Sequence, residues 1–380
     1  MLLRLFFTLN AIILLRAQVP GRVVPDQRCL KNELQGYALY LPANYSPERK
    51  WPVLMAFDPR ARGLNAVERF SEAAETYGWI VAGSNNSRNG PWDLSAMALA
   101  AMSQDLFERF AIDEDRIYVA GMSGGARVAF QIALGPGKVA GAIAASAAFP
   151  AGQKRDSVHF PVFGTAGTED FNWLEMKDLD RSLKTRHRVR VFEGGHVWMP
   201  KELATEAVEW MELEAMKSGL RPKDAARIEA MLGRRKAAAE RAEGREAWEQ
   251  VRAIGADFES LHPEASTFAG RARQMEKERT VKDALKAERK EVELELDSRR
   301  QIGEGEGGLN NPATRRASLD SLREKLGRLA KQAKSQDDSA QRRVARRIVR
   351  GIGAGPATTD PQYRELLNDL GMSGRPILKP

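Results

Sequence analysis

Short apolar runs alternate with longer amphipathic stretches between residues 36 and 196, and this alternation constrains the fold more than any other feature of the sequence. The runs predict strands at 37–42, 51–57, 79–84, 116–121, 140–146, 160–166 and 188–193. The stretches between them predict helices at 65–77, 94–110, 124–134 and 172–185, with a closing helix at 201–216. Strands that are apolar along nearly their whole length must be covered on both faces. We therefore predict an α/β fold with a doubly wound, mostly parallel sheet.

The composition of the chain changes near residue 220. The net charge of +8 lies wholly in 221–380, which hold 34 Lys and Arg against 26 Asp and Glu, so the preceding residues are neutral. Ala, Glu, Lys and Arg at helical spacing predict an α-helical C-terminal region there. The predicted parts are an α/β domain at 30–218, a repeat-like helical region at 220–300, a Gly-rich linker at 301–314 and a basic helical tail at 315–380. In the repeat-like region, Trp248 and Phe258 at helix-pair spacing are weakly similar to a tetratricopeptide unit.

The N-terminus has the pattern of a secretory signal peptide, which we assign to residues 1–18. A mostly apolar run from Leu5 to Leu15 follows one early arginine and precedes Ala17-Gln18. A membrane anchor is the alternative, but a run of about 11 residues is short for crossing a bilayer. Cys29 is the only cysteine, so the chain has no internal disulfide. Export without disulfides predicts a bacterial protein that is secreted or periplasmic.

Residues 121–125, Gly-Met-Ser-Gly-Gly, lie between the strand at 116–121 and the helix at 124–134. The pattern G-x-S-x-G in the order strand, turn, helix is that of a nucleophile elbow, in which small neighbours let strand and helix approach closely. Ser123 is therefore the candidate nucleophile, and the alternative is a glycine-rich turn with no chemical role. The amide of Gly124, at the start of the helix, is the candidate donor to a substrate oxyanion.

A serine hydroxyl needs a base, and the chain has four histidines. His159 and His187 precede their strands and lie at the wrong end for a site at the carboxyl edge of the sheet, while His262 belongs to the helical region. His196 directly follows the last predicted strand and two glycines. It is therefore the candidate base, and a structural loop histidine is the alternative.

The base in turn needs a carboxylate that fixes its tautomer. The loop after the strand at 160–166 offers Glu169 and Asp170, and we favour Asp170, although an Asp there also suits a helix N-cap. A second oxyanion donor is expected from the loop after the strand at 51–57. There the amide of Arg60 is the candidate, because Pro59 has no N–H.

These residues, in the order Gly121-Met122-Ser123-Gly124-Gly125, Gly167-Thr168-Glu169-Asp170 and Gly194-Gly195-His196, resemble the α/β-hydrolase superfamily. The resemblance covers residues 36–216 and is to small serine esterases similar to dienelactone hydrolases, polyhydroxybutyrate depolymerases and feruloyl esterases. One departure is the loop after 51–57, which lacks the His-Gly pair common in such esterases and has Asp58-Pro59-Arg60 instead.

Apolar residues near these positions are candidates for the substrate pocket, which we assign to Met122, Trp92 and Trp198, with packing as the alternative for the two tryptophans. No metal and no cofactor are expected. The basic tail contains five arginines on one helix, for which we expect a solvated face, with an anionic envelope surface or a protein partner as the alternative. They are Arg342, Arg343, Arg346, Arg347 and Arg350.

The predicted function is hydrolysis of a small-molecule or polymeric carboxylic ester through Ser123, His196 and Asp170 with an acyl-enzyme intermediate. A serine peptidase of the same fold is one alternative. A catalytically silent scaffold, whose helical region does the work, is the other, and the unusual Asp58-Pro59-Arg60 loop motivates it. No motif indicates a specific nucleic-acid function.

Overall fold

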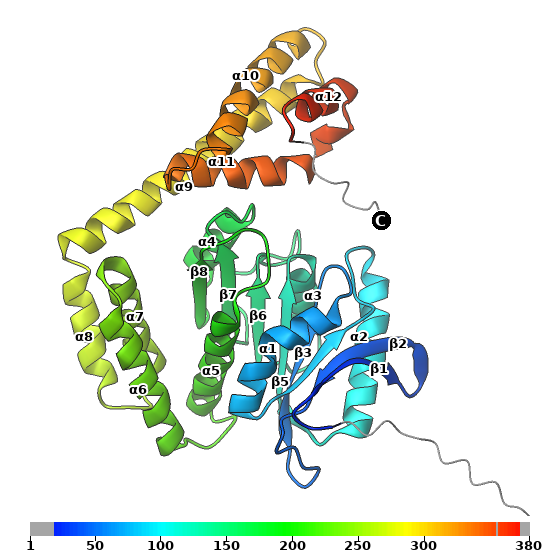
Figure 1. The fold of residues 1–380 in the computed structure, drawn as a ribbon, viewed down its shortest axis with the longest axis vertical. Helices are drawn as coiled ribbons and strands as arrows, with labels where there is room; N and C mark the ends of the chain where they lie inside the picture. Colours follow the sequence, from blue (N-terminus) through cyan, green and yellow to red (C-terminus); the bar gives the residue numbers. More distant parts are fainter. Residues whose placement is uncertain (1–18, 355, 373–380) are drawn as a thin grey trace, which may run out of the picture.

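A mostly parallel sheet of eight strands forms the first half of the computed structural model, which describes residues 19–354 and 356–372 (Figure 1). The predicted signal peptide at 1–18 lies outside the described residues. The strands are β1 (Val23–Cys29), β2 (Asn32–Tyr40), β3 (Trp51–Phe57), β4 (Ile80–Ser84), β5 (Ile112–Met122), β6 (Gly141–Ala145), β7 (Val162–Gly167) and β8 (His187–Phe192). Their order is β1-β2-β4-β3-β5-β6-β7-β8, and every pairing from β4 to β8 is parallel.

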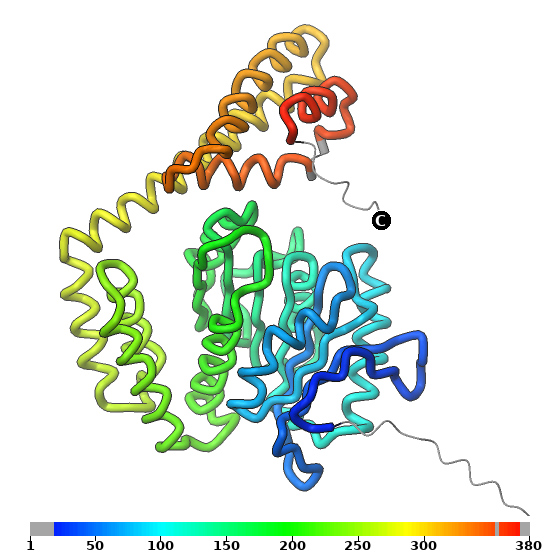
Figure 2. Tube along the Cα trace, viewed as in Figure 1, coloured from blue at the N-terminus to red at the C-terminus, as the bar shows by residue number. Residues whose placement is uncertain are grey.

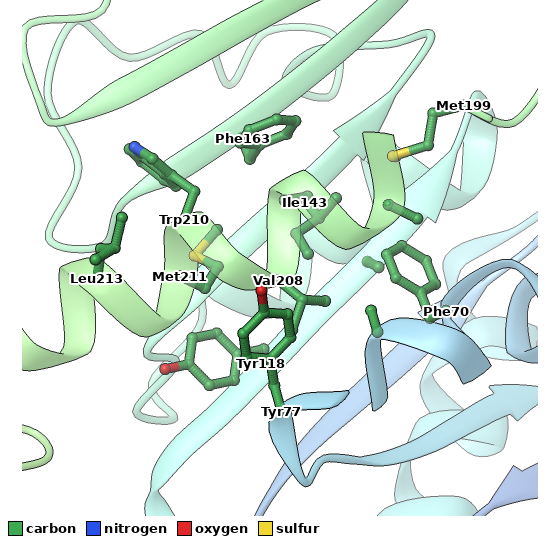
Figure 3. Packing of buried hydrophobic residues seen from close by; sticks show 14 of the residues in the cluster. Phe70, Tyr77, Tyr118, Ile143, Phe163, Met199, Val208, Trp210, Met211 and Leu213 are labelled. Atoms are coloured by element: carbon green, nitrogen blue, oxygen red, sulfur yellow. The ribbon is translucent and has the colours of Figure 1, made fainter. Parts of the chain in front are cut away.

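Helices cover both faces of this sheet, so the predicted doubly wound α/β fold is confirmed. They are α1 (Gly63–Tyr77), α2 (Trp92–Arg109), α3 (Gly124–Ala133), α4 (Trp173–Ser182) and α5 (Lys201–Ser218). One buried cluster joins α1 and α5 to the sheet, and Figure 3 shows Phe70 of α1 and Val208 of α5 packed over Ile143 of β6. A second cluster joins α2, α3 and α4 to the other face. The two clusters account for the near-continuous apolar runs of the strands.

The sheet begins earlier than the sequence predicted. β1 and β2 form an antiparallel hairpin at the edge of the sheet, which Figure 2 shows in dark blue. β1 (Val23–Cys29) contains Pro25, Asp26 and Arg28 and is half exposed. An edge strand with one open side needs no apolar run, and its pattern is therefore too polar to predict.

The second half of the chain is helical, as predicted. Its helices are α6 (Ala225–Arg241), α7 (Gly244–Asp257), α8 (Ala265–Met275), α9 (Arg279–Gly308), α10 (Arg315–Ala333), α11 (Ala340–Gly351) and α12 (Pro361–Asp369), with short 3₁₀ turns at Ile352–Ala354 and Pro356–Thr359. Helices α6 to α8 extend the core around α5, because Met231 and Val251 belong to the same buried cluster as Trp210. Within the described residues, no helix is long and apolar enough to cross a membrane.

The sequence predicted a flexible linker at 301–314, and the structure corrects this, because α9 continues through Gly308. The glycines there allow two helices to pack closely. A β-carbon on Gly305 would lie 2.8 Å from Leu322, and one on Gly308 would lie 2.1 Å from the hydroxyl of Ser318. Leu322 is fully buried in the small core that α9 to α12 share. We call these four helices the helical arm. In Figure 1, α11 of this arm crosses above the end of the sheet toward which the parallel strands point.

A buried charge cluster joins β8, α5 and α6. Glu206 on α5 accepts contacts on a single carboxylate oxygen from Arg188 (3.2 Å), Arg190 (3.3 Å) and Arg235 (3.2 Å). Burial opposes ionisation, but the three guanidinium groups outweigh it and lower the pKa of Glu206 to about 2. The ionised carboxylate is therefore part of the native packing.

We expect Glu206→Gln to destabilise the protein by about 3 kcal/mol at neutral pH, because it removes the one carboxylate that three largely buried arginines share. The pKa of Glu206 in the folded protein lies below the ordinary pKa of a glutamate. Its contribution to the free energy of unfolding is therefore complete above the ordinary pKa and is lost as the pH falls toward about 2. The variant should therefore show a weaker loss of stability between neutral and acid pH than the wild type. Thermal unfolding across this range, with exposed Glu202→Gln on the same helix as control, measures both effects, and an unchanged pH dependence would contradict the assignment.

Candidate catalytic site

Ser123 lies on a sharp turn between β5 and α3. Its backbone has φ 54° and ψ −121°, a conformation that L-residues rarely adopt and that surroundings must enforce. Two neighbours show how: a β-carbon on Gly121 would lie 2.0 Å from the carbonyl oxygen of Gly125, and one on Gly125 would lie 1.9 Å from that of Phe57. The glycines thus permit a backbone crossing that no larger residue would allow, and the turn has the form of a nucleophile elbow.

The three predicted catalytic side chains lie in one hydrogen-bonded chain. The Nε2 atom of His196 is 2.8 Å from the Oγ of Ser123, and its Nδ1 atom is 2.7 Å from Oδ1 of Asp170. Asp170 is fully buried, whereas His196 and Ser123 are partly exposed. A hydroxyl, an imidazole and a carboxylate, the groups that a nucleophile, its base and an orienting acid would require, are therefore within direct hydrogen-bonding reach of one another.

The parallel pairing of β7 with β8 brings the acid and the base together. Beyond the strands the two loops remain joined, because the amide of Glu169 donates to the carbonyl oxygen of Gly194 at 2.8 Å. Gly167, at the end of β7, has no room for a side chain, since its β-carbon would lie 2.4 Å from the carbonyl oxygens of Gly194 and Gly195. The glycines on both loops thus set the distance between Asp170 and His196.

Two further residues, which sequence reasoning missed, hold Asp170 and His196 in place. The amide of Asn172 donates to Oδ1 of Asp170 at 2.9 Å, so this oxygen accepts from both Asn172 and His196. Phe171 stacks on the imidazole with ring centroids 3.9 Å apart and planes inclined by 27°. The stacking and the hydrogen bonds together fix the plane of the histidine ring.

Glu169, the other candidate acid, pairs with arginines, whereas His196 pairs with Asp170. The carboxylate of Glu169 lies 2.5 Å from Arg346 and 3.0 Å from Arg350 of α11. Asp170, the acid favoured from the sequence, is thus the carboxylate that contacts His196.

The five arginines of α11 do not form the solvated face expected from the sequence. All five pair with carboxylates of α9, of the α10–α11 connection or of the acid loop, because the helix packs between them.

The predicted oxyanion donors have different surroundings. Gly124 is the first residue of α3, so its amide has no intrahelical acceptor. The amide of Arg60 instead donates to Oδ1 of Asp58 at 2.9 Å. Asp58 is a fully buried carboxylate that also binds the guanidinium of Arg62, whose pKa it raises. A buried carboxylate must accept hydrogen bonds, so the Arg60 amide donates to Asp58 and is not free for a substrate.

Asn89 is a residue near the nucleophile that sequence reasoning missed. Its Oδ1 and Nδ2 atoms lie 1.7 and 3.3 Å from the place where a β-carbon on Gly124 would stand. The loop that holds it is tied to the Arg60 loop, because the amide of Asn89 donates to the carbonyl oxygen of Pro59 at 2.9 Å. Its carboxamide, on an exposed residue, therefore lies beside Gly124, and only its place after β4 could have indicated this.

The three expected pocket residues are not gathered together. Trp198 is buried, packs edge-on against Phe70 and donates its indole N–H to Asp58 at 2.9 Å. Met122 is buried in the same core. Met122 and Trp198 thus pack in the buried core between the sheet and α1, which corrects their assignment to the substrate pocket. Trp92, the first residue of α2, is 38% exposed and remains a candidate for substrate contact.

Comparisons with known proteins bear on the first half of the chain. No protein-family model matches the chain, and no curated protein sequence matches it. A thermostable esterase is 18% identical with a TM-score of 0.37, and the match covers 49% of this chain and 61% of that one, less than two thirds of its length. A feruloyl esterase module from Clostridium thermocellum is 13% identical, with a TM-score of 0.40 and coverage of 50% and 86%. The Bacillus cereus carboxylesterase is 16% identical, with a TM-score of 0.38 and coverage of 48% and 96%.

Likeness at these identities concerns the fold alone. The chain's own features agree with the α/β-hydrolase arrangement that the sequence resembles: a parallel sheet from β4 to β8, an elbow after β5, an acid after β7 and a histidine after β8. In the part of the chain that the structure describes, no group of His, Cys, Asp and Glu is arranged to hold a metal ion.

The elbow predicts losses of stability of very different size when two neighbouring glycines are replaced by alanine. Gly125→Ala should destabilise the protein by about 2 kcal/mol or more, because the new methyl group meets the backbone at Phe57. Gly124→Ala should cost far less, since the methyl group meets only the end of the Asn89 side chain, which can rotate away. Chemical denaturation of both variants checks this, and equal stabilities would contradict the close backbone crossing.

Proposed function

We propose that the protein is a serine hydrolase that cleaves carboxylic esters through Ser123, His196 and Asp170. The single observation that carries the proposal is the continuous hydrogen-bonded chain from Ser123 through His196 to Asp170, built on a turn with a positive φ at the serine. A strained nucleophile conformation has a cost of order 1–3 kcal/mol, which a turn without chemical role does not require.

The geometry supports a two-step acyl transfer. Nε2 of His196 takes the hydroxyl proton as Oγ of Ser123 attacks the ester carbonyl carbon, and the carbonyl π electrons move to the oxygen. The tetrahedral oxyanion collapses, the bond to the alcohol oxygen breaks, and His196 returns the proton to the leaving alcohol. Water then attacks the acyl-enzyme by the same route in reverse, which releases the acid and restores Ser123. Asp170 orients the imidazole and stabilises its charged form.

Support for the oxyanion comes from the start of α3. The amide of Gly124 is free of an intrahelical acceptor and carries the positive end of the helix dipole. Because the Arg60 amide donates to Asp58, the carboxamide of Asn89 beside Gly124 is the better candidate for the second donor. A side-chain amide in that role is worth about 10²–10³ in rate where it has been removed.

The proposal also favours an enzyme over a silent scaffold. The unusual Asp58-Pro59-Arg60 segment, which raised the scaffold alternative, is accounted for by the buried position of Asp58, whose carboxylate joins this loop to Trp198 two residues after the base. The loop therefore holds the histidine loop in place. Export to a bacterial envelope or to the medium remains part of the proposal, on the strength of residues 1–18.

The test is covalent labelling of Ser123. A fluorophosphonate probe should label the wild type and a Ser71→Ala control, and Ser123→Ala should show no labelling while keeping its thermal unfolding temperature. Short-chain p-nitrophenyl esters should be turned over, and peptide anilides should not. Absence of labelling in folded wild type would sink the enzyme proposal, and faster cleavage of anilides would replace the ester by a peptide bond.

The acid is tested separately. Asp170→Asn should lower kcat by about 10³–10⁴-fold, because an amide in that place favours the wrong tautomer of His196. Asp178→Asn on α4, which loses only surface contacts with Lys154 and Arg181, is the matched control. Steady-state kinetics with the same ester measure both variants. A loss below tenfold in Asp170→Asn would remove Asp170 from the proposed mechanism.

A further inference from the structure

The loop that carries the catalytic acid is enclosed by arginines from the far end of the chain. Glu169, next to Asp170, is nearly fully buried and lies 2.5 Å from Arg346, 3.0 Å from Arg350 and 3.8 Å from Arg342. Three guanidinium groups of one helix thus meet a single carboxylate. The contact joins α11 to the residue directly before the acid.

The backbone of the same loop is held as well. The carbonyl oxygens of three residues that flank Asp170 each accept a hydrogen bond from an arginine of the helical arm. They are Thr168 from Arg347 at 2.7 Å, Glu169 from Arg350 at 3.3 Å and Phe171 from Arg299 at 3.0 Å. The carbonyl of Asp170 accepts from the amide of Trp173 at 2.8 Å. Every carbonyl from 168 to 171 therefore has a partner, and the arm supplies three of the four.

The arginines are themselves fixed. Arg347 is 1% exposed, lies 2.7 Å from Glu291 and 2.6 Å from Glu295 of α9, and its guanidinium stacks 4.0 Å above the ring of Trp173. Arg299 lies 2.7 Å from the same Glu295. Buried guanidinium groups with this many partners keep one geometry, so they hold the loop as rigid supports.

We propose that Arg299, Arg346, Arg347 and Arg350 form a clamp that positions the catalytic acid, so that the helical arm is part of the hydrolytic machinery. The inference rests on the proposed function, since it assigns a role toward Asp170 and His196. The clamp reaches the base too: a β-carbon on Gly195 would lie 2.9 Å from Arg350, and Phe171, which stacks on His196, contacts Gly351.

The positioning role follows from what the chemistry requires. A misplacement of about 1 Å at a catalytic group costs about 10²-fold in rate, and catalytic side chains are held by partners that are fixed in turn. Asp170 lies in a loop, where a free backbone would move. The four arginines replace the regular secondary structure that would otherwise hold it.

The test removes the contacts of Glu169 and leaves the folded arm. The double variant Arg346→Gln/Arg350→Gln should lower kcat for a p-nitrophenyl ester by about 10- to 100-fold with KM unchanged. It should slow fluorophosphonate labelling of Ser123 to a similar extent. The matched control is Arg343→Gln on the same helix, whose partners are Glu291 and Asp338 and which does not touch residues 168–171. Arg346→Lys/Arg350→Lys should recover most of the lost kcat.

A second variant breaks the same contact from the other side. Glu169→Gln should lower kcat to a similar extent. The triple variant, which combines Glu169→Gln with Arg346→Gln and Arg350→Gln, should be no slower than the double arginine variant, because both sets of changes break the same contact between Glu169 and α11. If the double variant unfolds far below the control, Glu169→Gln alone decides the question.

Two outcomes would overturn the clamp: kcat values equal to that of Arg343→Gln, or a loss carried by KM alone. A wild type without Ser123-dependent labelling would instead refute the proposed function, so the two failures are distinct.

Discussion

Parallel pairing of β5, β6, β7 and β8 is the constraint on which the site depends. Because all four strands point the same way, the residues that follow β5, β7 and β8 meet at one edge of the sheet, although they are far apart in sequence. A shift of one residue in the β7–β8 pairing would move Asp170 and His196 relative to each other by about 3.3 Å. The glycine contacts between the two loops prevent such a shift, and the distances among Ser123, His196 and Asp170 are therefore a property of the whole sheet.

The parts of the site that could be predicted are those with a local or a topological sign. Gly121, Ser123 and Gly125 stand together in sequence, and the contact of Gly125 with Phe57 shows why the pattern needs small residues. His196 followed from elimination and from its place after the last strand. Asp170 was favoured over Glu169, and their separate partners, His196 and the arginines of α11, show how two adjacent carboxylates divide into two roles.

The parts that could not be predicted depend on partners distant in sequence. The Arg60 amide looked available because the sequence does not say that Asp58 is buried and takes it. A glycine-rich segment looked flexible, whereas Gly305 and Gly308 admit the side chains of α10. The arginines of α11 have the spacing of a surface helix, and only the fold shows that Glu169 and the carboxylates of α9 lie opposite them. Charge along one element does not reveal which elements face it.

The position of Arg346, 177 residues after Glu169, has a consequence for synthesis of the chain. The sheet and its helices are complete by residue 218, well before α11 leaves the ribosome. During that interval the acid loop has its strand and its histidine but none of its arginine partners, and Glu169 remains an uncompensated carboxylate. A chain that has emerged only as far as α5 thus holds every strand of the sheet, whereas the arginines that contact the loop of Asp170 are still to come.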